Sequence, residues 1–145
     1  MTVGGRGEVA ELVRDLDDIP PELRRLLRPK LRAAAQPIVA RARRKASWST
    51  RIPSAIKVQT SFSGRHPGVF IRVDATKAPH ARPFENLGKP GTFRHPVFGD
   101  REVWVNQKAR PFLFPAVEAA GPHVREVVSD AISDAARLHG FRPSA

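Results

Sequence analysis

The spacing of the apolar residues changes along the chain in an order that limits the fold more than any other feature of the sequence. From Glu22 to about Ala46, apolar residues recur every three or four positions, as on one side of a helix. Two pairs of short segments follow, in which apolar and polar residues alternate as in strands. After Arg110 the helical spacing returns. Strands that cluster between helices predict an α+β fold with a small antiparallel sheet of two β-hairpins.

The helical patterns predict N-terminal basic amphipathic helices and a long C-terminal helix packed on the sheet. Their buried stripes are expected to contain, in the first pattern, Leu23, Leu27, Leu31, Ala34, Ile38 and Ala42, and in the last, Val117, Val124, Val128, Ile132, Ala135 and Leu138. Pro29 and Pro37 each remove a backbone donor, so the first pattern predicts two or three shorter pieces or a kinked helix. Gly121-Pro122 predicts a break or kink in the last helix, which Gly140 is expected to end.

The strand patterns define two hairpins. The first pairs "AIKVQTSF" with "VFIRVDA" around the loop "SGRHPG", and its apolar face is expected to carry Ile56, Val58, Thr60, Val69, Ile71 and Val73. The second pairs "TFRHPVF" with "EVWVN" around a Gly-Asp turn. Pro96 cannot donate to a ladder, so its strand is expected at a sheet edge or a bulge. One helical turn is expected around Phe84–Leu87, between the hairpins.

The chain of 145 residues is expected to form a single domain, with an N-terminal helical arm over 1–20 and a short tail over 141–145. It contains no cysteine, which excludes disulfides and thiolate metal sites. No apolar run approaches the roughly 20 residues that cross a bilayer, so no membrane partner is expected. The first residues also lack the apolar middle of a signal peptide, which indicates a protein made in a cytoplasm.

The sequence carries few features of an enzyme. It has no Cys, no Tyr, no G-x-S-x-G, and no phosphate-binding or dinucleotide-binding glycine loop. The five histidines are scattered, and none has the H-x-x-x-H spacing of a helical metal site. We therefore expect no catalysis, no metal and no cofactor.

The charge is strongly positive. There are 25 Lys+Arg against 14 Asp+Glu, a net charge of +11. Ten basic residues and no acid lie between Arg24 and Arg51. Such a basic face attracts phosphate backbones or acidic protein surfaces. Its predicted members are Arg24, Arg28, Arg32, Arg41, Arg43 and Arg44. A non-specific nucleic-acid-binding module that uses this Arg-rich helix is therefore one hypothesis for the function.

A second hypothesis comes from the segment Thr92–Ala116, which concentrates large aromatic residues. Five of them lie there, too many for a small domain to bury all of them: Phe93, Phe98, Trp104, Phe112 and Phe114. Pro111 and Pro115 hold the chain around "FLF" stiff, and stiff aromatic and arginine groups suit protein contacts. The predicted protein interface comprises Arg110, Phe112, Phe114, Trp104, Phe98 and His95. For Trp104 and Phe114, an alternative role is to hold the sheet to the last helix.

Two short motifs in this region suggest a family. "HARPFENLG", then a short hairpin, then "ARPFLFPAVEAA" at the start of the last helix resembles neck and tail-completion proteins of tailed bacteriophages and prophages, relatives of gene product ten of a lambda-like phage. The matching positions are His80, Ala81, Glu85 and Gly88 in the first motif, and Arg110, Pro111, Phe112, Pro115 and Ala116 in the second. The segment "STRIPSAIKV" departs from the family pattern, which has a glycine-led turn there.

The resemblance implies a structural virion protein that is assembled in the host cytoplasm and resides in the neck or tail. Such a subunit is expected to form a ring of several copies, six-fold by the symmetry of these tails, at the head–tail junction. Its expected partners are the tail terminator, tail tube or connector proteins, and DNA that passes through without being read. The resemblance implies neither catalysis nor a cofactor.

Overall fold

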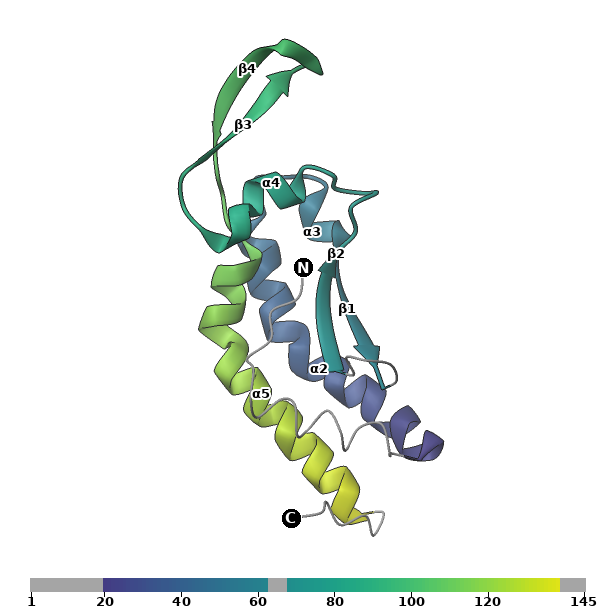
Figure 1. The fold of residues 1–145 in the computed structure, drawn as a ribbon. Coiled ribbons are helices and arrows are strands. Elements are labelled where there is room, and N and C mark those ends of the chain that lie inside the picture. The colour runs from purple at the N-terminus through teal and green to yellow at the C-terminus, as the bar shows by residue number, and fades with distance from the viewer. Residues whose placement is uncertain (1–19, 63–67, 139–145) are drawn as a thin grey trace.

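The computed structural model describes residues 20–62 and 68–138, and its class is α+β as predicted (Figure 1). Helix α2 (Pro21–Lys45) leads through the short α3 (Ile52–Ala55) into hairpin β1–β2 (Ile56–Ser61 and Gly68–Val73). The short helices α4 (Ala81–Glu85) and η1 (Asn86–Gly88) follow. A second hairpin, β3–β4 (Thr92–Val97 and Asp100–Lys108), precedes the long helix α5 (Leu113–Leu138). The predicted helical segment 8–17, Gly140 and the tail 141–145 lie outside the described residues.

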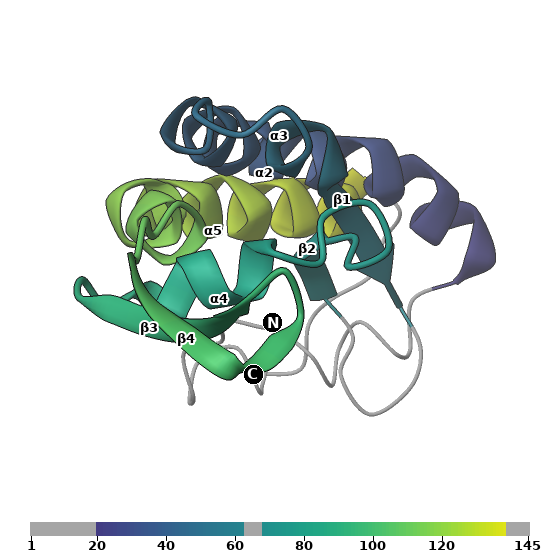
Figure 2. The same cartoon turned by 90° about the horizontal axis from the view of Figure 1, so that it is seen from above.

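The two long helices form the body of the molecule, where they lie side by side and antiparallel (Figures 1 and 2). One cluster joins the second half of α2 to the start of α5, with Val39 and Ala42 against Phe112 and Ala116. The other joins the first half of α2 to the end of α5 through Leu27 and Ala135. Hairpin β1–β2 packs its apolar face on this body, as expected: Val58, Ile71 and Val73 contact the first cluster and Val69 the second.

The two hairpins form two separate two-stranded sheets. β1 pairs with β2 from Ile56 opposite Val73 to Ser61 opposite Gly68. β3 pairs with β4 from Thr92 opposite Lys108, and the register shifts between Pro96 and Val97. The prediction that Pro96 sits at an edge or bulge is therefore confirmed. The hairpins do not share one sheet because β3–β4 projects from one end of the body (Figure 1).

The prolines do not divide the helices. Of the two alternatives predicted for the first pattern, shorter pieces or a kinked helix, the structure excludes the shorter pieces. α2 runs unbroken through Pro29 and Pro37, and α5 through Pro122. All three prolines are exposed, so water can satisfy the carbonyls that lose their intrahelical partners.

Inside the helices, the buried stripe of α2 contains Ala35 and Val39, whereas Ala34 is half-buried. Leu138 is 78% exposed and lies outside the core. Within the described residues, no helix is long and apolar enough to cross a membrane.

The exposed prolines predict a gain in stability when they are removed. Replacing Pro29 by Ala restores a backbone donor in the middle of α2 and removes a clash with the preceding turn. We expect the free energy of unfolding to rise by up to about 3 kcal/mol, measured by urea denaturation. Gln36→Ala, an exposed change in the same helix, is the control and should alter stability by less than about 0.5 kcal/mol. An unchanged or lower midpoint for Pro29→Ala would contradict this account.

Candidate docking hairpin and the cap at its base

Hairpin β3–β4, here called the projecting hairpin (residues 92–108), has little of its own chain to pack against. β4 is exposed at every position except the half-buried Gln107. Phe98 is fully exposed at the turn, where it adopts a positive φ of 49°. Trp104 is 46% exposed, between the exposed Val103 and Val105. A two-stranded hairpin on its own is marginally stable in water, so this apolar surface is poorly suited to remain bare.

Local contacts hold the exposed tryptophan in place. The Trp104 Nε1–H donates to the Arg101 carbonyl at 2.6 Å. On the paired strand, the Arg94 guanidinium lies 5.6 Å from the centre of the Trp104 ring. An aromatic ring fixed in this way loses little entropy when a partner covers it, and cation–π contacts of this kind favour a defined orientation. Trp104 is therefore held in one orientation at the surface of the hairpin.

A row of rings continues from the projecting hairpin into the body. The Phe93 ring lies 5.1 Å from Phe84, and Phe84 lies 4.6 Å from Trp48. Arg110, exposed at the base, places its guanidinium 5.2 Å from the centre of the Trp48 ring. His95 is half-buried against Phe93, at 5.9 Å, and its Nδ1 lies 3.1 Å from the Pro96 carbonyl. The hairpin thus joins the body through packed rings and not through a bare linker.

The base of the projecting hairpin is closed by a buried carboxylate, here called the Glu85 cap. Glu85 is 1% exposed. Its Oε2 accepts from the N–H groups of Phe112 (2.8 Å) and Leu113 (2.9 Å), and its Oε1 from that of Phe114 (2.7 Å). These donors stand at the N-terminus of α5, where they have no partner within the helix and where the helix dipole favours a negative charge. One side chain therefore satisfies three donors from a segment 27 or more residues away.

Backbone contacts complete this closure. The Arg110 N–H donates to the Phe84 carbonyl at 2.9 Å, and that of Ala109 to the Gly91 carbonyl at 2.8 Å. Gly88 has a φ of +78°, and a Cβ there would lie 2.5 Å from the Phe114 Cβ. Only glycine fits this position without displacing Phe114. The motifs "HARPFENLG" and "ARPFLFPAVEAA" are therefore two halves of one contact.

The predicted interface residues separate into exposed and buried ones. Phe98, Trp104 and Arg110 are exposed, and His95 is half-buried. Phe112 is 0% exposed in the core, so the prediction that it contacts a partner is wrong for the folded chain. Its ring instead fills the space between α2 and α5. Phe114 is half-buried and lies against Gly88 of η1. In the sequence, Glu85 is marked only by the resemblance and by its position three residues before a glycine.

The predicted basic face is not one continuous surface. Arg43 donates from Nε to the Pro53 carbonyl (3.0 Å) and from Nη2 to the Ile56 carbonyl (3.1 Å), so it holds α3 and β1 against α2. Arg32 and Arg41 are nine residues apart, which places them on opposite sides of the helix at about 100° per residue. The exposed members are Arg28, Arg32, Arg41, Arg43 and Arg44, whereas Arg24 is half-buried.

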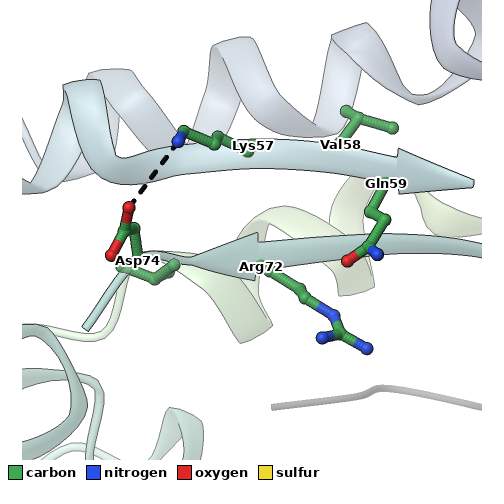
Figure 3. Close-up of a pocket in the computed structure, with 6 residues that line it drawn as sticks. Lys57, Val58, Gln59, Arg72 and Asp74 are labelled. Carbon is green, nitrogen blue, oxygen red and sulfur yellow. Dashed lines mark ion pairs between the residues drawn. The ribbon is translucent and has the colours of Figure 1, made fainter. Parts of the chain in front are cut away.

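One open hollow lies on the outer side of hairpin β1–β2 (Figure 3). Lys57 Nζ lies 3.6 Å from Asp74 Oδ2, and Arg72 points away from this pair (Figure 3). The Thr76 hydroxyl and backbone N–H both donate to Asp74, and the hydroxyl contact is the main reason that the pKa of Asp74 is lowered. The polar groups do not converge on a common point, so we assign no ligand to this hollow.

Over the described ranges, no group of His, Asp and Glu is placed to hold a metal.

Comparisons with known proteins identify no relative: no family model, no curated protein and no solved structure matches the chain. The function therefore has to be inferred from the chain's own residues.

The Glu85 cap predicts a large effect on stability. Glu85→Ala leaves three N–H groups without their acceptor, two of them buried, and we expect the free energy of unfolding to fall by about 2–4 kcal/mol. Glu85→Gln keeps one acceptor oxygen and should lose less. The measurement is urea denaturation followed by circular dichroism. Glu102→Ala removes an exposed carboxylate from β4 and is the control; equal losses in the Glu85 and Glu102 variants would argue against the cap.

Proposed function

We propose that this chain is a structural virion protein of a tailed phage, a tail-completion or neck ring subunit at the head–tail junction that docks the tail to the connector. The observation that carries the proposal is the projecting hairpin: a stiff element with exposed Phe98 and Trp104, fixed at its base by the Glu85 cap. An element of this kind is suited to fit against another protein.

The way the hairpin is fixed supports docking over a flexible tether. Residues that must hold their orientation while bound to a partner profit from a rigid base, because less entropy is lost on binding. Here a buried carboxylate, two backbone hydrogen bonds and a row of packed rings fix the base. Natural interfaces are enriched in aromatic residues and arginine, the same types that the hairpin and its base expose.

The resemblance to neck and tail-completion proteins gains support from the positions of its motif residues. Glu85 and Gly88 come from the first motif, and Phe112 from the second, and all three take part in the closure at the base of the projecting hairpin. The motifs would then be maintained for the geometry of the hairpin and not for direct contact. On this proposal, the partners are further copies in a six-fold ring and the tail terminator, tail tube or connector, and the place of action is the virion, assembled in the host cytoplasm.

A second candidate function is non-specific binding of nucleic acid. It is favoured by Arg32, Arg41 and Arg44, which are exposed and have no ion-pair partner among residues 20–62 and 68–138. Their arrangement on different sides of α2 suits a loose phosphate contact more than readout of bases. The two candidates are compatible if DNA passes through the ring. They differ in which element the function needs.

Deleting the gene from the phage or prophage that encodes the chain tests the proposal. We expect filled heads and finished tails to accumulate unjoined in electron micrographs, and the wild-type chain supplied in trans to restore joined particles. The double variant Phe98→Ser, Trp104→Ser should restore at least about tenfold fewer, because two exposed aromatic contacts would be lost. Both side chains are exposed, so the fold should be retained.

Two controls make the outcome specific. Leu26→Ser makes an equally polar change at an exposed leucine of α2, away from the projecting hairpin, and should restore joining fully. Arg41→Ala and Arg44→Ala together test the nucleic-acid candidate. If this double variant fails to restore joining while the hairpin variant succeeds, or if joined particles form without the gene, the proposed function is wrong.

A further inference from the structure

The exposed side of α5 carries an unneutralised row of acids in its second half. Glu126, Asp130 and Asp134 follow one another four residues apart, and Arg137 comes three residues later. All four side chains are exposed. In the part of the chain that the structure describes, none of them forms an ion pair. Like charges four residues apart on a helix repel, so this row is unfavourable in a lone chain and would be relieved by facing cations.

The first half of α2 carries the opposite pattern. Glu22 is followed by three arginines, Arg25, Arg28 and Arg32, and all four are exposed. Arg28 rests on the Phe62 ring at 5.6 Å, but neither it nor its two arginine neighbours has a carboxylate partner within the described ranges. The row therefore presents one negative and then three positive charges in chain order.

The two rows lie at the same end of the molecule. Leu23 and Leu27 of α2 pack in one cluster with Ile132 and Ala135 of α5, and this end is far from the projecting hairpin (Figure 1). Because α2 and α5 are antiparallel, both rows can be read from that end inwards. α2 then shows negative, positive, positive, positive, whereas α5 shows positive, negative, negative, negative. At 1.5 Å per residue they span about 15 Å and about 17 Å.

We propose that a second copy of this chain docks here, with the α2 row of one copy against the α5 row of the next. The aligned order would place Arg25, Arg28 and Arg32 opposite Asp134, Asp130 and Glu126. The rows are two different surfaces of one molecule, so the contact is heterologous. Both rows lie at the same height along the body, so successive copies would not be displaced along its axis, and this favours a closed ring over a helical filament. The inference deepens the proposed function by naming the contact between copies.

The occupant is a protein helix of mixed charge and not nucleic acid. A phosphate backbone would match the three arginines but gain nothing from the acids of α5, which it would repel. An acidic partner of uniform charge would likewise leave the α5 row uncovered. A second copy supplies both complements with the same spacing and direction. Complementary charges of this kind set the register of a contact and exclude wrong partners.

Crosslinking tests the contact directly, because the chain has no native cysteine. Full-length Arg28→Cys and Asp130→Cys chains are mixed at low salt and treated with a short bismaleimide. We expect several-fold more mixed dimer than from Arg44→Cys with Asp130→Cys, since Arg44 is exposed at the other end of α2. A yield no higher than that of the control pair would overturn the inference.

Charge reversal tests its energetic basis. A chain with Glu126→Lys, Asp130→Lys and Asp134→Lys should self-associate at least about tenfold more weakly in sedimentation velocity at low salt. Adding Arg25→Glu, Arg28→Glu and Arg32→Glu to the same chain should restore association. Equal association of all three chains, or a wild-type chain that stays monomeric, would overturn the inference. If the chain is monomeric but still joins heads to tails through the projecting hairpin, the inference fails and the proposed function stays.

Discussion

The contact between the Glu85 carboxylate and the N-terminus of α5 is the constraint on which the rest of the structure depends. It joins the short helices after the first hairpin to the long C-terminal helix, and the projecting hairpin is the loop that this contact closes. Burying a carboxylate is costly unless it is fully hydrogen-bonded, and here both oxygens accept from backbone donors. Those donors would otherwise be unsatisfied at a buried helix end. Each group thus compensates the cost of burying the other.

Much of the architecture follows from local patterns in the sequence. The alternation in residues 56–73, and the turn between residues 97 and 100, are enough to predict both hairpins, because each pairs strands that are close in the chain. The helical spacing predicts both ends of α2 and the start of α5 nearly correctly. The effect of the prolines cannot be predicted from neighbouring residues alone. Whether Pro29 breaks a helix depends on whether its side faces solvent, which tertiary packing decides.

The candidate docking surface is harder to predict for the same reason. Composition shows that residues 92–116 hold more aromatic rings than a small core needs, but not which rings are buried. Phe112 and Phe98 look alike in sequence, yet one is in the centre of the core and the other is fully exposed. The difference comes from Glu85, which draws the backbone of Phe112 inwards from a distant segment. A long-range contact made by a single acid leaves no periodic signal.

Two features of the molecule are uncompensated in a single chain, and they lie at opposite ends. The projecting hairpin exposes apolar rings at one end, and the other end carries matched rows of opposite charge. Apolar contacts persist at any salt concentration, whereas exposed charge pairs weaken as salt screens them. Suppose that copies join through charges and that the assembly docks another protein through aromatic side chains. A change in salt concentration could then alter the number of joined copies without weakening the contact with that partner. If copies join as proposed, the charged rows also stay clear of the docking hairpin, since the body of two long helices stands between the two surfaces.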